Sequence, residues 1–344
     1  MSTYAESTQR HFWKFTADDL RAARKGTAAA AAAAAAATAA AAAPPTPAEV
    51  AWLRLHFEAK LVQFCALVEA SVAEREEAEP ADHEVIRQQR RERLRRRQRR
   101  VAHTALVYFK RVCLRRSLLD PRLNPRLLVL ASIYMAAKVE EEHADITLRQ
   151  LCEMGGVRPG EIIAVELQVL ELIRFQVSIF HGFRSLEALL GKLKETVQWR
   201  SNLPAGYLAR FMKLKIPDYT SVLETHESVA VFLRRRALEL LRRCYYTDAV
   251  LMYSPSQLAI SCIMAAVMRP GMAADVPEPK LIKQLKDEEL TPFIVGFFSD
   301  FLKKDVKKLH RCMRDVLQMI ILELPQRPSD EERAAALLRM VNNK

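Results

Sequence analysis

The chain has 344 residues, of which 50% are hydrophobic and 27% charged, with 9 glycines, 6 cysteines and a formal net charge of +12. This length fits two domains with appendages, and the composition excludes a wholly disordered chain and a small disulfide-stapled protein. Because glycine and alternating β-branched residues are scarce, it also disfavours a β-sandwich and a glycine-loop nucleotide fold, and predicts an all-α protein.

The N-terminal region joins a short aromatic segment to a tract of alanine. The segment His11–Phe15 is too short to fold alone. We expect the tract Ala28–Ala43 to be a helical or disordered spacer and not a membrane span, because alanine gains little on transfer to lipid. Thr46 and Glu49 have the spacing of a capping box, which predicts a helix from about Pro47 to Ala73.

A charged stretch over residues 74–100 comes next, acidic at first and then strongly basic. We interpret it as an insertion that forms a solvated helical extension. The alternative is a nuclear localisation signal or a phosphate-contacting patch, although base stacking is not indicated because no aromatic residue interleaves the run. The residues of this patch are Arg90, Arg91, Arg93, Arg95, Arg96, Arg97, Arg99 and Arg100.

Four further helices are expected to complete a first domain over residues 48–178. The first of them carries an apolar face from Val101 to Cys113, and the second, Leu127 to Lys138, is apolar on nearly every side. A helix that is apolar on nearly every side is typical of the centre of a bundle. A shorter helix near Thr147–Glu153 and a fifth helix from Pro159 to Arg174 follow.

The second half of the chain shows a similar succession of helical segments, without obvious sequence identity to the first half. It predicts a second five-helix domain over residues 179–324. Residues 1–47 precede the two domains, and a terminal helix over 325–344 follows them. Helices of the second domain are expected at Arg184 to Trp199, Glu224 to Tyr246, Pro255 to Met268, weakly near Lys280, and Val295 to Leu324.

Three strings of the first domain resemble the second, third and fifth helices of a first cyclin box, in the right order. They are Thr104–Arg111, Leu130–Glu141 and Glu166–Phe175. The Tyr-Phe-Lys-Arg end of the first string is similar to that of the transcription-associated cyclins. Cell-cycle cyclins tend to carry an aspartate where Lys110 stands.

Within that group, three further blocks resemble the cyclin H subfamily. They are the N-terminal Ser7–Thr16, Phe64–Val68 at the end of the first box helix, and Thr247–Ile260 at the start of the second domain. The cyclin C subfamily shares the Tyr-Phe-Lys-Arg string and a Thr-Asp start of the second box, and is the nearest alternative.

The resemblance implies two tandem cyclin boxes in a regulatory subunit that is not an enzyme. It implies binding and activation of a cyclin-dependent kinase of the CDK-activating type, in transcription and cell-cycle control. The partners implied are that kinase, a RING-finger assembly factor and the TFIIH core, in the nucleus. We expect no cofactor, no metal and no membrane, and nucleic acid is not expected as a direct partner.

Two alternative functions stay open at this point. One is a cyclin C-like subunit of the Mediator kinase. The other belongs to a different class, a TFIIB-like adaptor between DNA and basal factors. That class normally has an N-terminal zinc ribbon, which the wide spacing of the six cysteines cannot build.

Six residues are candidates for a kinase-binding site. Lys138 ends an apolar helix and Glu166 lies in another, so the two charges are expected to pair across adjacent helices. An ordinary internal salt bridge is the alternative. The resemblance implies that the lysine donates to carbonyls of the kinase's C-helix, while the glutamate orients it. It also implies an apolar wall, for which core packing is the alternative, made of Val139, Leu170, Phe175 and Val177.

Overall fold

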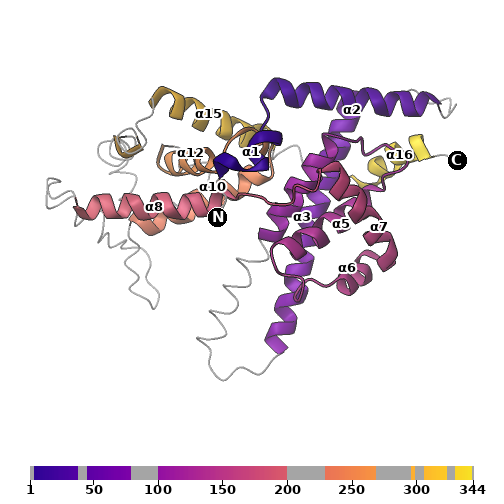
Figure 1. Ribbon diagram of the computed structural model, residues 1–344, viewed down its shortest axis with the longest axis horizontal. Helices are drawn as coiled ribbons and strands as arrows, with labels where there is room; N and C mark the ends of the chain where they lie inside the picture. The colour runs from indigo at the N-terminus through magenta and orange to yellow at the C-terminus, as the bar shows by residue number, and fades with distance from the viewer. Residues whose placement is uncertain are drawn as a thin grey trace. The chain divides into compact units, whose positions relative to one another are not determined.

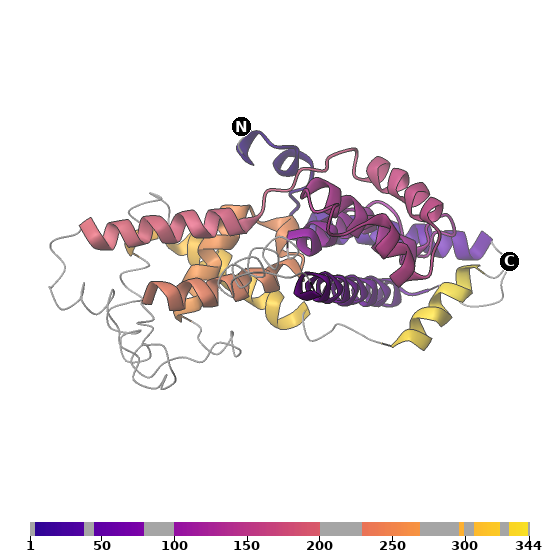
Figure 2. The same ribbon diagram turned by 90° about the horizontal axis from the view of Figure 1, so that it is seen from below.

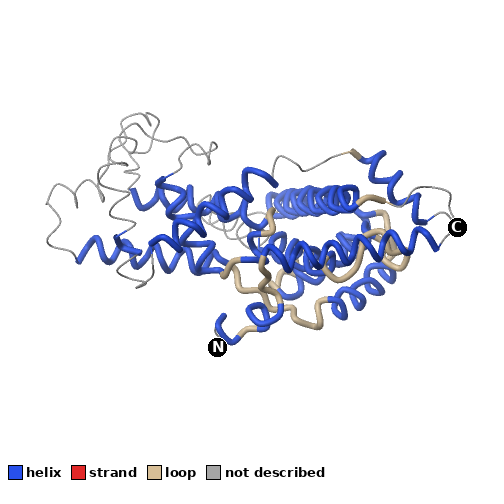
Figure 3. Tube along the Cα trace, turned by 90° about the horizontal axis from the view of Figure 1, so that it is seen from above, coloured by secondary structure: helices blue, strands red, loops and turns tan. Residues whose placement is uncertain are grey.

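A computed structural model describes residues 4–37, 45–78, 100–199, 229–268, 296–298, 306–323 and 330–342. Every regular element in these ranges is a helix, as Figure 3 shows, so the all-α prediction is confirmed for them. None of these helices is long and apolar enough to cross a bilayer. The chain divides into two compact units, Met1–Ile179 with Gln326–Lys344, and Phe180–Pro325.

Five helices form the core of the first unit (Figure 1). They are α3 (Pro47–Ala78), the helical residues 100–113, α5 (Pro125–Val139), α6 (Leu148–Gly155) and α7 (Pro159–Leu172). The helix α5 contacts α3, α6 and α7, and ten of its fifteen residues are buried. A helix that is apolar all round is stable only when covered, which explains the central place of α5.

Side-chain caps mark the N-termini of two of these helices, and the cap of α3 is the predicted one. The Thr46 hydroxyl accepts from the Glu49 amide at 3.3 Å, and the Glu49 carboxylate accepts from the Thr46 amide at 2.8 Å. The Asn124 side chain accepts from the Arg126 amide at 3.0 Å, directly before α5. The helix α3 continues to Ala78, past the expected end at Ala73, because no glycine or proline interrupts the sequence there.

The terminal segments also belong to the first unit. They include the short turn η1 (Tyr4–Glu6), α1 (Thr8–Phe12), α2 (Ala17–Ala37) and α16 (Glu331–Asn342). The helices α2, α3 and α16 contact one another in pairs and lie side by side in Figures 1 and 2. The alanine tract is therefore helical as far as Ala37, with Ala28 and Ala31 buried, and the rest of it lies outside the described residues.

Charged contacts attach α16 to α3. The Glu331 carboxylate forms an ion pair with Lys60 and lies 3.6 Å from Nε2 of His56, which is buried. The Arg333 guanidinium lies 4.6 Å from the ring centroid of Trp52. The Lys60 hydrogen bond, helped by the charges of Lys60 and His56, holds the pKa of Glu331 below its ordinary value.

The second unit is organised around α12 (Pro255–Met268), which contacts four other described helices of that unit. These are α8 (Gly182–Trp199), α10 (Val229–Tyr245), α11 (Ala249–Met252) and α15 (Val306–Glu323). A capping box precedes α12, with the Ser254 amide 2.9 Å from the Gln257 side-chain oxygen and the Gln257 amide 3.3 Å from the Ser254 hydroxyl.

Two helices of the second unit begin at other residues than the sequence predicted. The helix α15 begins at Val306 and not at the expected Val295. Residues 296–298 are also helical, and 299–305 lie outside the described residues. The helix α10 begins at Val229, while residues 224–228 and the segment near Lys280 lie outside the description.

A buried cluster of three charges joins α3 to the helical residues 100–113. The Lys110 ammonium lies 2.7 Å from one carboxylate oxygen of Glu58, and the Arg54 guanidinium lies 2.6 Å from the other. The side chains of Lys110 and Glu58 are fully buried, and that of Arg54 is nearly so. One carboxylate therefore serves as the counter-ion of two cations.

We expect Glu58→Gln to lower the free energy of unfolding by about 3–5 kcal/mol, because it leaves two buried cations without their counter-ion. Lys110→Met keeps the Arg54–Glu58 pair and should cost less. Urea denaturation followed by circular dichroism measures both losses. Equal losses in the two variants would contradict the role of Glu58 as the shared counter-ion.

Candidate functional site

The expected pair of charges lies where α5 ends against α7. The Lys138 ammonium donates a hydrogen bond to Oε1 of Glu166. The Lys138 nitrogen also lies 4.4 Å from the ring centroid of Tyr134, one turn earlier on α5. The Glu166 side chain is 13% exposed, but that of Lys138 is 39% exposed. The ammonium has three donors, so the internal pair leaves it donors for an external acceptor.

Two of the four apolar candidates neighbour this pair along the chain, because Val139 follows Lys138 and Leu170 lies one helical turn after Glu166. Phe175 is 62% exposed and Val139 is also exposed, so core packing is the wrong interpretation for both. Leu170 and Val177 are half-buried. Large exposed apolar side chains gathered around a charged pair are typical of a protein interaction surface.

Two residues of this surface were not among the expected site residues. Ile163 and Leu167 lie one turn apart on α7 and are 51% and 55% exposed. Helical spacing places them on the same side as Glu166 and Leu170. We call the complete surface the α5–α7 face, made of Lys138, Val139, Ile163, Glu166, Leu167, Leu170, Phe175 and Val177.

The sequence did carry a signal for the two missed residues. The helix α7 is apolar on more than one side, while its buried residues, Ile162, Val165 and Val169, all lie on one side. An amphipathic helix of a globular protein needs one apolar stripe, so the remaining apolar residues of α7 are in excess of what its packing uses. This excess indicates a second apolar surface.

The turn that follows α7 presents Phe175 to solvent. Arg174 and Phe175 both have left-handed backbone conformations, with φ of 57° and 56°. Each costs a residue with a side chain about 1–2 kcal/mol, so the surroundings must enforce the conformation. The Phe175 amide donates to the Leu170 carbonyl at 2.7 Å, which closes the turn over the last residues of α7.

Buried residues of the first unit hold this turn in place. Tyr108 donates its hydroxyl to the Val177 carbonyl at 2.5 Å, and Arg111 donates to the Gln176 carbonyl at 2.8 Å. Burial raises the pKa of Tyr108 and lowers that of Arg111 to about 9, so both remain donors at neutral pH. Side chains of the helical residues 100–113 therefore hold this turn in place.

The N-terminal aromatic segment docks on the same turn. The indole N–H of Trp13 donates to the side-chain oxygen of Gln176, and the ring of Trp13 is buried. The Arg111 and Arg115 guanidinium carbons lie 4.7 and 5.3 Å from its centroid. This docking leaves the neighbouring Phe12 exposed.

The arginine patch lies almost wholly outside the described residues. Arg90, Arg91, Arg93, Arg95, Arg96, Arg97 and Arg99 fall in the range 79–99, which the structure does not describe. Arg100 is exposed, and its Nε lies 3.8 Å from a carboxylate oxygen of Glu140.

Metal-binding and thiol chemistry have little support in the described ranges. No group of three or more histidine, cysteine, aspartate or glutamate side chains is arranged there to hold a metal ion. All six cysteines are free. Burial raises the pKa of Cys65 and Cys113, to about 12 for the latter, which keeps these thiols protonated and unreactive.

Both halves of the chain match domains of one family. Residues 86–178 match the family described as "Cyclin, N-terminal domain", and residues 181–321 match "Cyclin C-terminal domain". The two matches together cover more than half of the chain and correspond to the two expected cyclin boxes.

Individual relatives are distant. The chain is 25% identical over 178 residues to Cyclin-H of Xenopus laevis, a match that covers 50% of this chain and 46% of that protein. It is 32% identical over 100 residues to Cyclin-C1-1 of Arabidopsis thaliana, covering 26% of this chain and 38% of the relative. The matches thus span less than half the length of these relatives.

A solved structure shares the fold. A chain of the CAK complex from Chaetomium thermophilum bound to ATP-gamma-S aligns with a TM-score of 0.61 and 19% identity. The alignment covers 99% of this chain and 86% of that one. Together with the two domain matches, it confirms the tandem cyclin-box fold, while the match to Cyclin-H of Xenopus laevis confirms the resemblance to cyclin H.

We expect Trp13→Phe to loosen the turn after α7, because it removes one hydrogen bond, worth about 1 kcal/mol, while keeping an aromatic ring. Hydrogen exchange at the amide of Phe175 should become about fivefold faster. Phe12→Ala, at an exposed neighbouring position, is the control and should leave that rate unchanged. An unchanged rate in Trp13→Phe would show that Trp13 does not support the turn.

Proposed function

The chain belongs to the cyclin family, and from that membership we propose that it binds and activates a cyclin-dependent kinase of the CDK-activating type without being a catalyst itself. The α5–α7 face is the observation that carries the proposal. It combines exposed apolar side chains with an ammonium that is held by one carboxylate and still open to solvent. The relative named Cyclin-H and the fold shared with a CAK complex support the choice of kinase.

The chemistry of the face suits a helix whose carbonyl end points toward Lys138. The last carbonyls of a helix lack partners within the helix and carry partial negative charge, so they accept from an ammonium. Glu166 keeps that ammonium in position, and the apolar side chains beside it receive the apolar side of the same helix. We propose that this is the C-helix of the kinase.

Activation then follows from selective binding. The chain binds the kinase conformer in which the catalytic Lys–Glu pair is assembled, and so favours that conformer. Raising its population from about 1% to about 99% requires about 5.5 kcal/mol of differential binding. Burying a large apolar side chain contributes about 1.5–3 kcal/mol, so contacts of Ile163, Leu167 and Phe175 that only the assembled conformer makes supply a difference of this size.

The assembly and the location are part of the same proposal. We propose a complex with a RING-finger assembly factor and the TFIIH core, in the nucleus, where the kinase phosphorylates the RNA polymerase II tail and the activation loops of other kinases. The CAK complex, as a structural relative, supports this setting. The docked N-terminal segment places exposed Phe12 next to the Phe175 turn, as an additional kinase contact.

A cyclin C-like subunit of the Mediator kinase is the second candidate. The identity of 32% to Cyclin-C1-1 of Arabidopsis thaliana over 100 residues favours it. The TFIIB-like adaptor is not proposed, because both halves of the chain match cyclin domains.

The two kinases can be compared directly. We expect the chain to stimulate phosphorylation of an activation-loop substrate by a CDK-activating-type kinase subunit, and not by a Mediator-type one. Lys138→Ala and Glu166→Ala should each weaken kinase binding about tenfold or more, since a hydrogen bond to a charged group contributes about 1.5–3 kcal/mol. Arg149→Ala, which breaks an exposed ion pair on α6, is the matched control. Stimulation of the Mediator-type kinase alone would select the second candidate.

A charge in the apolar part of the face gives a separate test. Leu167→Asp should abolish kinase binding, because the complex would bury an unpaired carboxylate, while helical circular dichroism stays unchanged. The control is Leu322→Asp, at an equally exposed position on α15. Normal kinase binding by Leu167→Asp would show that α7 is not part of the interface.

A further inference from the structure

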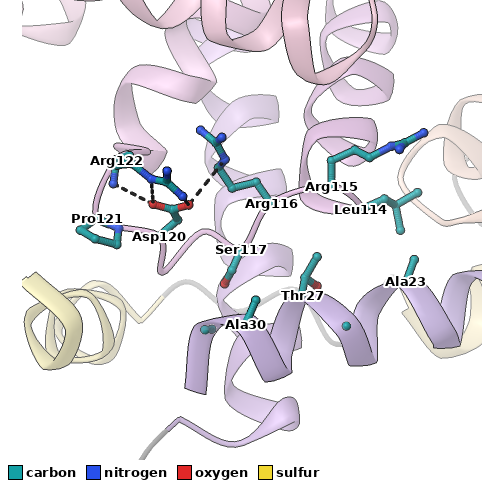
Figure 4. A pocket seen from close by; sticks show the side chains of 12 residues that line it. Ala23, Thr27, Ala30, Leu114, Arg115, Arg116, Ser117, Asp120, Pro121 and Arg122 are labelled. Atoms are coloured by element: carbon teal, nitrogen blue, oxygen red, sulfur yellow. Dashed lines mark hydrogen bonds and ion pairs between the residues drawn. The ribbon is translucent and has the colours of Figure 1, made fainter. Parts of the chain in front are cut away.

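A second candidate site lies in the first unit, between α2 and the segment 114–122 that leads to α5. The cavity there has a volume of about 650 Å³. Small residues of α2 line one side, and Figure 4 shows the side chains of Ala23, Thr27 and Ala30 rising toward the opposite segment. A Cβ atom added at Gly26 would meet no atom within 4 Å, so the groove is open above this glycine. A ligand backbone can therefore approach α2 closely.

The opposite side of the groove is basic. It carries Arg115, Arg116 and Arg122 against one acid, Asp120. Arg122 binds both oxygens of Asp120, at 3.1 and 3.0 Å, and Arg116 lies 3.5 Å from one of them (Figure 4). Burial acts to raise the pKa of Asp120, but these contacts outweigh it and hold the pKa below its ordinary value. The carboxylate is thus ionised and positions two guanidinium groups.

The positive charge of this side exceeds what Asp120 can neutralise. Arg115 packs on Trp13, and no ion pair joins it to any residue within the described ranges. Arg115 thus gives the groove a positive charge that no acid within the described ranges pairs with, and such a charge favours the binding of an anion.

We propose that this groove binds an acidic peptide segment of a protein partner. The small residues of α2 accommodate the peptide backbone, and the arginines pair with its carboxylates. No aromatic ring is among the residues that line the groove, so it lacks the stacking surface that single-stranded RNA uses. None of the lining residues belongs to the α5–α7 face, so an acidic partner and a kinase would use different surfaces.

The test uses the full chain and a fluorescein-labelled eight-residue peptide of alternating glutamate and alanine. Fluorescence anisotropy should show saturable binding that weakens as salt is added, because the contacts are between exposed charges. Arg115→Gln should weaken binding about tenfold, the loss of one charge-assisted hydrogen bond. Arg149→Gln, remote on α6, is the charge control and should leave binding unchanged.

A second variant fills the groove without changing charge. Gly26→Leu should abolish peptide binding, and it should not disturb folding because the added side chain enters open space on a helix. Ala29→Leu is the matched control, on the same helix but outside the groove. Binding of a lysine–alanine peptide of equal length, or no saturable binding below about 1 mM, would overturn the proposal. So would preferential binding of an eight-nucleotide single-stranded RNA that Gly26→Leu abolishes.

Discussion

The need to cover α5 determines the arrangement of the first unit. Ten of its fifteen residues are buried, and α3, α6 and α7 each cover part of it. The other described helices do not cover the C-terminal end of α5, and Lys138 and Val139 are exposed there. The α5–α7 face therefore forms where the end of α5 reaches the surface of the unit. The exposed side of α7 lies next to this end.

The shape of that face depends on segments that are distant in sequence. Trp13 and the helical residues 100–113 fix the turn that carries Phe175, although more than 60 residues separate each of them from it. The strain of two left-handed residues is stored at the edge of the interaction surface and is balanced by hydrogen bonds from the core. A partner helix is expected to bind this surface more tightly than a mobile one, because the turn is already ordered and little conformational entropy is lost on binding.

Local signals predicted the helices better than they predicted the use of their surfaces. The capping box before α3 and the all-round apolar pattern of α5 followed from sequence spacing alone. The exposure of Leu167 did not, because periodicity counts apolar residues without showing how many neighbours are present to cover them. The pairing of Lys110 with Glu58 joins residues 52 positions apart and depends on tertiary packing, which no local pattern contains.

The position of α16 has a consequence for synthesis. The first unit includes residues from both ends of the chain, and Glu331 makes its contacts with Lys60 and His56 on α3. A chain that emerges vectorially from the ribosome exposes the docking surface on α3 long before α16 is made. Throughout the translation of the whole second unit, the nascent first unit therefore presents an uncovered apolar and basic surface to chaperones.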